Sequence, residues 1–130
     1  MIVSYLLFLS LAATTQEPPA WVIRGMLATE SSSEIVNGKV IRHDKRNDRD
    51  SIGCLQMREI AWRDVCDKLP GRNREELEAD DALAIKACTL YLKRYYKEST
   101  GWDGAIQSYN AGPGKKSSVY LSKVKKAGIK

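Results

Sequence analysis

The sequence is poor in the residues from which metal sites and nucleophilic triads are built. His43 is its only histidine, and Cys54, Cys66 and Cys88 form no CxxC pair. We therefore expect no metal site and no cofactor. A Cys–His or Ser–His–Asp apparatus would need a better-placed histidine. Cys66 and Cys88 fall in two expected helices and could pair in an exported protein; the alternative is three buried free thiols.

The sequence also lacks an apolar run that crosses a bilayer comfortably, which takes about 20 residues. Residues 2–13 are apolar but short, and they end in small residues, as the hydrophobic region and cleavage site of a secretory signal do. No Lys or Arg precedes this run. We expect residues 1–16 to be a signal peptide or N-terminal anchor, followed by one domain at 17–130. The alternative is a first helix packed onto the domain.

No repeat or low-complexity segment is present, and 43% hydrophobic residues indicate a globular domain. The formal net charge is +5, but basic residues alternate with acidic ones, as in 44–50, and only the tail from 115 is distinctly basic. This pattern favours an anionic cell envelope over nucleic acid as the partner. We expect a monomer that does not bind nucleic acid.

Residues 21–32 predict a buried amphipathic helix that begins after two prolines. Val22 and Met26 lie on one stripe of this helix, and Ile23 and Leu27 on the next. Glu30 falls in the last turn, where apolar neighbours and the negative end of the helix dipole both disfavour its charged form. The pattern predicts a carboxyl with a raised pKa, as a general acid requires. The alternative is a surface glutamate at a frayed helix end.

The remaining chain predicts a small β element and further helices. Two short extended runs flank an Asn-Gly turn at 37–38, which indicates a hairpin. The expected helices are 57–69, 80–98, a short one at 105–109 capped by Asp103, and 117–126.

Three motifs follow one another along the chain: Glu-Ser at 30–31, Gly-Cys-Leu-Gln-Met at 53–57, and Ser-Tyr-Asn-Ala-Gly-Pro-Gly at 108–114. In this order they resemble the lytic transglycosylase (SLT) family of lysozyme-like enzymes. Tyr-Leu-Ser-Lys-Val at 120–124 is similar to the last motif of that family. The resemblance implies a mainly α, lysozyme-like α+β fold with a small β element and a substrate cleft.

The resemblance also implies an activity: cleavage of the N-acetylmuramic acid to N-acetylglucosamine β-1,4 bond of peptidoglycan. Most glycosidases use two carboxylates for such a bond. Here the resemblance implies that Glu30 alone first protonates the glycosidic oxygen and then acts as base. The C6 hydroxyl of the muramyl residue attacks C1, which leaves a 1,6-anhydromuramyl end.

The resemblance assigns substrate-binding roles to five further residues. Ser31 holds the substrate or supports the catalytic glutamate, unless it is only a hydroxyl at a helix end. Gln56 contacts the sugar, the Tyr109 hydroxyl hydrogen-bonds the catalytic carboxyl, and Asn110 contacts the N-acetyl group. Tyr120 lines the cleft; the alternative is a core tyrosine.

Asp48 leaves other functions open. It precedes Gly53 much as aspartates that position a hydrolytic water do in goose-type lysozymes, so a second reading is a hydrolase that uses Glu30 with Asp48 as a secondary carboxylate. A third reading is an inactive glycan-binding module or structural virion protein. We expect the protein in the periplasm or cell envelope, or in a phage virion, with a membrane, virion or secretion-complex association.

Overall fold

The computed structural model describes residues 14–69 and 73–129. The segment expected to be a signal peptide or anchor therefore lies almost wholly outside the described residues. Within these ranges no helix is both long and apolar enough to span a bilayer. The elements, in chain order, are α2 (Ala20–Ser31), β1 (Ser33–Val36), β2 (Lys39–Arg42), α3 (Glu59–Arg63), the 3₁₀ helices η1 (Cys66–Lys68) and η2 (Arg74–Glu78), α4 (Asp81–Tyr95), α5 (Gly101–Ala111) and α6 (Ser118–Gly128). This mainly helical fold with one small sheet confirms the expected class.

Helix α2 forms as its sequence predicts. Pro19 precedes its first turn, and the backbone of Val22 donates to the Pro19 carbonyl at 3.0 Å. The helix ends where Ser32 takes a left-handed conformation with φ of 51°. Val22, Met26 and Leu27 are fully buried, whereas Ile23 is only half-buried. The predicted apolar face is thus confirmed.

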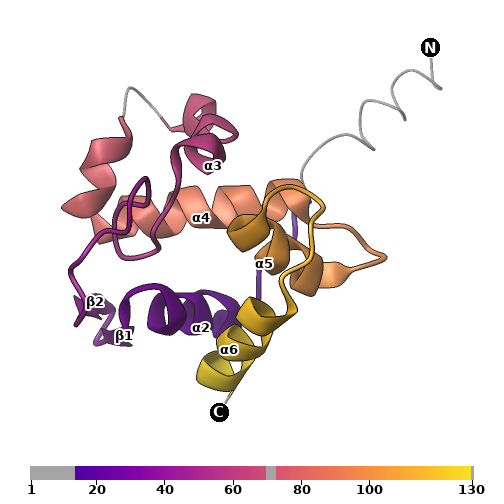
Figure 1. Ribbon diagram of the computed structural model, residues 1–130, viewed down its shortest axis with the longest axis horizontal. Helices are drawn as coiled ribbons and strands as arrows, with labels where there is room; N and C mark the ends of the chain where they lie inside the picture. The colour runs from indigo at the N-terminus through magenta and orange to yellow at the C-terminus, as the bar shows by residue number, and fades with distance from the viewer. Residues whose placement is uncertain (1–13, 70–72, 130) are drawn as a thin grey trace.

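Helix α6 crosses α2 at unusually close range (Figure 1). A Cβ atom at Gly25 would lie 2.1 Å from the Val124 carbonyl oxygen, and one at Gly128 would lie 2.1 Å from the Trp21 carbonyl oxygen. Only glycine permits this backbone approach. The Arg24 guanidinium then donates to the carbonyl of Gly128, with Nε at 2.9 Å, and so ties the end of α6 to α2.

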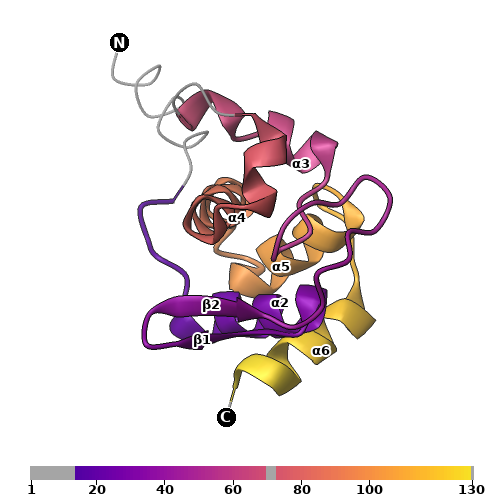
Figure 2. The same cartoon turned by 90° about the vertical axis from the view of Figure 1, so that its left-hand side faces the viewer.

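Helix α4 runs through the middle of the molecule, with α3 on one side and α2 on the other (Figures 1 and 2). The Asp80 carboxylate accepts from the backbone of Leu83 at 2.9 Å and caps the helix, which starts close to where the sequence predicts. The helix ends at Tyr95 rather than near 98, because Tyr96 is extended. Its buried stripe comprises Leu83, Ala84, Ala87, Cys88, Tyr91 and Leu92.

The hairpin confirms the expected β element. β1 and β2 pair antiparallel, from Ser33 opposite Arg42 to Val36 opposite Lys39. The turn residues Asn37 and Gly38 have φ of 52° and 77°, as a type I′ turn requires. Figure 2 shows the hairpin beside α2, from whose end it starts. The chain therefore leaves the Glu30 end of α2 directly into the hairpin.

Three local expectations need correction. The helix expected at 57–69 is the short α3 followed by η1, because Val65 has φ of −129° and interrupts the turn pattern. Helix α5 starts at Gly101, so Asp103 is not its cap but lies in its first turn, where it binds Lys125 Nζ at 2.7 Å. Of the two alternatives for the cysteines the structure has the free thiols, but only Cys54 and Cys88 are buried and Cys66 is half-buried.

We predict that Gly25→Ala destabilises the protein by roughly 2 to 4 kcal/mol, because the new methyl group meets a backbone carbonyl that cannot rotate away. Helix propensity alone predicts the opposite sign, a gain of about 1 kcal/mol. Urea unfolding measures the difference. A variant as stable as the wild type would show that the crossing of α2 and α6 tolerates a wider separation.

Candidate active site

A pocket of about 310 Å³ collects most of the residues predicted for the site. Its lining comprises Glu30, Asp48, Ser51, Gln56, Arg58, Tyr109 and Asn110. These residues come from the end of α2, from the segment between β2 and α3, and from α5. A larger groove of about 1060 Å³, between residues 64–68, α4 and α5, contains none of the predicted residues. The smaller pocket is therefore the candidate site.

Glu30 sits in the last turn of α2 and its carboxyl is largely buried. Burial raises its pKa to about 7, and two contacts limit that rise: the hydrogen bond from the Tyr120 hydroxyl and the charge of Arg58. The Tyr120 hydroxyl donates to Glu30 Oε2 at 2.8 Å. The predicted rise in pKa is thus confirmed. Near neutral pH such a carboxyl can both give and accept a proton.

The tyrosine that bonds the carboxyl is Tyr120, so the expectation for Tyr109 is wrong. The Tyr109 hydroxyl donates to the Leu55 carbonyl at 2.6 Å, and its ring packs edge-on against Tyr91 at 5.4 Å. Tyr109 therefore supports the turn that carries Gln56, although it still lines the pocket. Tyr120 is buried and reaches Glu30 because α6 crosses α2 so closely.

Gln56 lines the pocket, but most of its hydrogen-bonding capacity is used within the protein. Its Nε2 donates to Asn47 Oδ1 at 3.0 Å and to the Gly53 carbonyl at 2.8 Å. Its Oε1 accepts from the backbone of Asp48 at 2.9 Å. Both amide hydrogens are thus engaged, and one acceptor position is left for a ligand. Gln56 mainly fixes the segment that carries Asp48.

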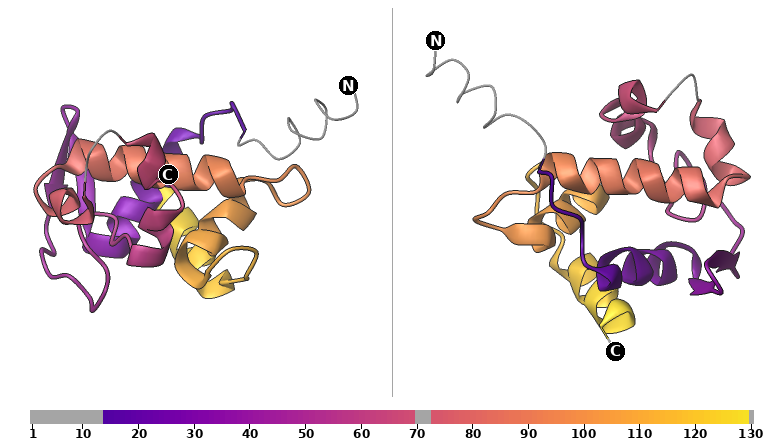
Figure 3. Two further views of the ribbon diagram at one scale, coloured as in Figure 1. Left: turned by 90° about the horizontal axis from the view of Figure 1, so that it is seen from above. Right: turned by 180° about the vertical axis from the view of Figure 1, so that it is seen from behind.

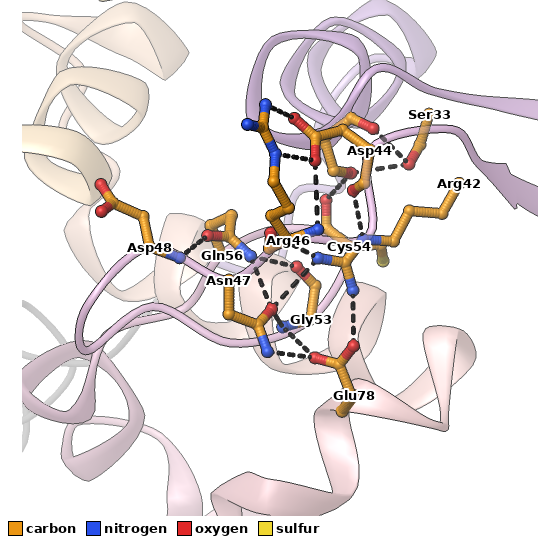
Figure 4. A network of polar contacts seen from close by, with 11 residues as sticks. Ser33, Arg42, Asp44, Arg46, Asn47, Asp48, Gly53, Cys54, Gln56 and Glu78 are labelled. Carbon is orange, nitrogen blue, oxygen red and sulfur yellow. Dashed lines mark hydrogen bonds and ion pairs between the residues drawn. The ribbon is translucent and has the colours of Figure 1, made fainter.

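A buried arginine holds the same segment from the other side (Figure 4). The Arg42 side chain is only 7% exposed and pairs with Glu78 Oε1 at 3.0 Å. Glu78 Oε2 accepts from Asn47 Nδ2 at 2.7 Å, and Arg42 Nη2 donates to the Arg46 carbonyl and to Asn47 Oδ1. Sequence reasoning missed Arg42 and Glu78, because no spacing links residues 36 positions apart.

Ser31 is buried outside the pocket lining. Its Oγ lies 2.6 Å from Ser33 Oγ and donates to the Cys54 carbonyl at 2.5 Å. The hydroxyl therefore joins the end of α2 to the turn at 53–57, immediately beside Glu30. This geometry fits the supporting role rather than contact with a substrate.

Of the three aspartates at 44, 48 and 50, only Asp48 lines the pocket. Asp44 is hydrogen-bonded by the side chain and backbone of Arg46, which lowers its pKa to about 2. Asp50 accepts from Arg74 Nη2 at 3.1 Å. The exposed Asp48 carboxylate makes no hydrogen bond or ion pair to any residue that the structure describes.

Asn110 lies exposed at the end of α5 and offers a free amide donor. Its Oδ1 accepts from the Ser117 hydroxyl at 2.6 Å, which orients the Nδ2 group away from that bond. Its backbone carbonyl accepts from Arg58 Nη2 at 2.9 Å. Sequence reasoning missed Arg58, because it follows the 53–57 motif and is not part of it. Over the described ranges, no three His, Cys, Asp or Glu side chains are grouped to hold a metal ion.

Comparison with protein-family models matches residues 21–130 to the transglycosylase SLT domain. The match begins at the start of α2 and extends through α6, so it includes every residue that lines the pocket. Searches of curated proteins and of solved structures found no significant match.

The pKa of Glu30 predicts the pH dependence of any reaction that needs its proton. kcat/KM should fall as pH rises through about 7, where the carboxyl ionises. Tyr120→Phe removes a donor that stabilises the charged form, so the pKa of Glu30 should rise further. The alkaline limb of the profile should then move to higher pH, measured between pH 5 and 9. An alkaline limb that moves to lower pH would show that the Tyr120 hydroxyl does not stabilise the charged form of Glu30.

Burial of Glu30 also predicts a stability change that needs no activity assay. Its pKa in the folded protein, about 7, exceeds the ordinary 4.5, so the folded state loses stability as pH rises from 4.5 to 7. The penalty is absent below pH 4.5 and complete above pH 7. Glu30→Gln should therefore be more stable than wild type by roughly 1 to 3 kcal/mol at pH 8 and equal to it at pH 4. Urea unfolding at both pH values tests this.

Glu34→Gln is the matched control for that measurement. Glu34 lies exposed on β1, where its carboxylate pairs with the exposed His43. Removing this charge should change stability by less than about 0.5 kcal/mol at pH 8. A Glu30→Gln variant that gains no more than this control would show that the Glu30 carboxylate is well solvated.

Proposed function

We propose a peptidoglycan-cleaving function for this chain, which belongs to the transglycosylase SLT domain family. Membership supports action on the glycan strands of peptidoglycan in general. The finer proposal is that the chain breaks the N-acetylmuramic acid to N-acetylglucosamine β-1,4 bond without water. The product then carries a 1,6-anhydromuramyl end. The protein would act where it reaches the wall, in the cell envelope or from a virion.

The observation that carries this proposal is one buried carboxyl, Glu30, with a pKa of about 7. In the first step its proton passes to the glycosidic oxygen, the bond from C1 to that oxygen breaks, and positive charge develops at C1. In the second step the Glu30 carboxylate takes the proton of the C6 hydroxyl while O6 bonds to C1. The carboxyl ends protonated as it began, and no water is consumed.

Two neighbours support these steps. The Tyr120 hydroxyl holds one oxygen of the Glu30 carboxyl, which leaves the other oxygen for the proton transfers. The oriented Asn110 amide can donate to the carbonyl of an N-acetyl group, since Ser117 already satisfies its oxygen. Both contacts fit a sugar held against the open end of α2.

Asp48 supports a second candidate, hydrolysis of the same bond. Its unpaired carboxylate lines the same pocket as Glu30, where a hydrolase keeps the residue that activates water. We favour the transglycosylase because Asp48 is exposed, and because its segment is braced through its backbone rather than through the carboxylate.

The product of the reaction separates the two candidates. We predict that the wild type releases anhydromuramyl ends, which are one water lighter than reducing ends and do not react with borohydride. Glu30→Gln should lose about 10²- to 10⁴-fold in rate, because the amide cannot donate the proton. Asp48→Asn should keep the product and most of the rate. Mass analysis of released muropeptides measures all three.

Reducible ends from the wild type, together with an inactive Asp48→Asn variant, would favour the hydrolase. Full activity in Glu30→Gln would remove Glu30 from both mechanisms. Because Glu30→Gln is expected to be at least as stable as wild type at neutral pH, loss of activity in it would not reflect unfolding.

A further inference from the structure

We propose that Arg58 binds a carboxylate on the C3 substituent of the muramyl residue and so selects substrate strands that carry this charge. This inference rests on the proposed function, which it extends from the bond cleaved to the strand chosen. It assigns a substrate-binding role to a residue that no motif of the sequence indicated.

Among the residues that the structure describes, Arg58 is the one cation lining the pocket, which also holds two carboxyl groups. It precedes the first residue of α3 and is half-buried. Its Nη2 donates to the Asn110 carbonyl at 2.9 Å, and no carboxylate of the described residues pairs with it. One Nη2 hydrogen is used in this bond, so one edge of the guanidinium, with two parallel N–H groups, remains available to a ligand.

Neighbouring arginines are used differently. Arg42, Arg46 and Arg74 each pair with a carboxylate of the protein, at 3.0, 3.0 and 3.1 Å. Each of these ion pairs holds a loop segment together. Arg58 instead binds a backbone carbonyl with one edge and leaves the rest of its planar fork unpaired. A guanidinium fork in this state fits a carboxylate well, because it can donate two parallel hydrogen bonds.

The chemistry of muramic acid places a carboxylate near this position. The acetamido group at C2 and the lactyl ether at C3 are carried by adjacent ring carbons. If the Asn110 amide holds the acetamido group at C2, the lactyl substituent begins on the adjacent ring carbon. Arg58 lies beside Asn110, because its Nη2 donates to the Asn110 backbone carbonyl. The lactyl group ends in a free carboxylate on strands without peptides. On intact strands it carries a peptide with its own carboxylates.

A carboxylate bound to Arg58 would also favour the protonated state of Glu30. Its charge lowers the pKa of Glu30 and so opposes the protonated state that the first step requires. A substrate carboxylate bound to Arg58 would offset that charge next to Glu30. A strand with the carboxylate would then both bind better and leave the acid more fully protonated than a neutral strand.

Binding to catalytically impaired protein tests the inference separately from the reaction. The ligands are soluble glycan strands freed of peptides, the same strands with the lactyl carboxylate converted to a methylamide, and peptide-bearing strands with free or amidated peptide carboxylates. Titration calorimetry compares Glu30→Gln with Glu30→Gln/Arg58→Gln. The matched control is Glu30→Gln/Arg63→Gln, which removes the same charge from the exposed Arg63 of α3.

We expect Arg58→Gln to weaken binding about tenfold for at least one carboxylate-bearing strand, and to leave the corresponding amidated strand unchanged. Arg58→Lys should recover part of the loss. A loss of affinity for the peptide-free strand would identify the lactyl carboxylate as the ligand of Arg58. A loss of affinity only for peptide-bearing strands would identify a peptide carboxylate. Arg63→Gln should match its parent throughout.

Equal affinity of Glu30→Gln for charged and amidated strands would overturn the inference. An equal loss of affinity for both kinds of strand after Arg58→Gln would overturn it as well. The proposed function has its own readout, the muropeptides released by wild type. A protein that discriminates by charge but releases no product would keep the inference and contradict the proposed function. A protein that releases product but binds charged and amidated strands equally would keep the proposed function and contradict the inference.

Discussion

The close contact between α2 and α6 is the constraint on which the site depends. Gly25 and Gly128 let the two backbones approach to a distance at which no Cβ would fit. That approach brings the Tyr120 hydroxyl to the Glu30 carboxyl at the C-terminal end of α2. The right-hand view of Figure 3 shows α2 and α6 side by side. A wider crossing would leave the carboxyl without its hydrogen bond and more open to water. The packing of two helices thus sets the state of one acid.

A second support fixes the opposite wall of the pocket. The Arg42–Glu78 pair and the Gln56 amide both bind Asn47, so the segment that carries Asp48 is held through its neighbours. Ser31 and Tyr109 add bonds to the carbonyls of Cys54 and Leu55. Polar residues that the resemblance assigned to substrate thus also secure the turn beside Glu30. Their rigidity leaves the unpaired groups of the pocket to meet a ligand, chiefly Glu30, Asp48, Asn110 and Arg58.

Local sequence patterns determined the elements and the apolar surroundings of Glu30. Two prolines before an apolar stripe specified α2, Asn-Gly specified the hairpin turn, and Asp80 specified the start of α4. The raised pKa of Glu30 followed from its place at an apolar helix end, because burial acts on whatever carboxyl the apolar stripe carries. These features depend on residues within a few turns of one another, and so the sequence alone predicted them.

Tertiary packing decided which groups meet. Nothing local distinguishes Tyr109 from Tyr120 as the partner of Glu30; the helix crossing selects Tyr120, 90 positions away. Arg42 and Glu78 are likewise joined only by the fold, and Arg58 becomes a pocket residue only because α5 ends beside it. A hydrogen bond needs placement within a fraction of an ångström, whereas hydrophobic patterning fixes only which face is buried. The sequence therefore specified a glutamate at an apolar helix end, and the packed structure specified the neighbours of that glutamate.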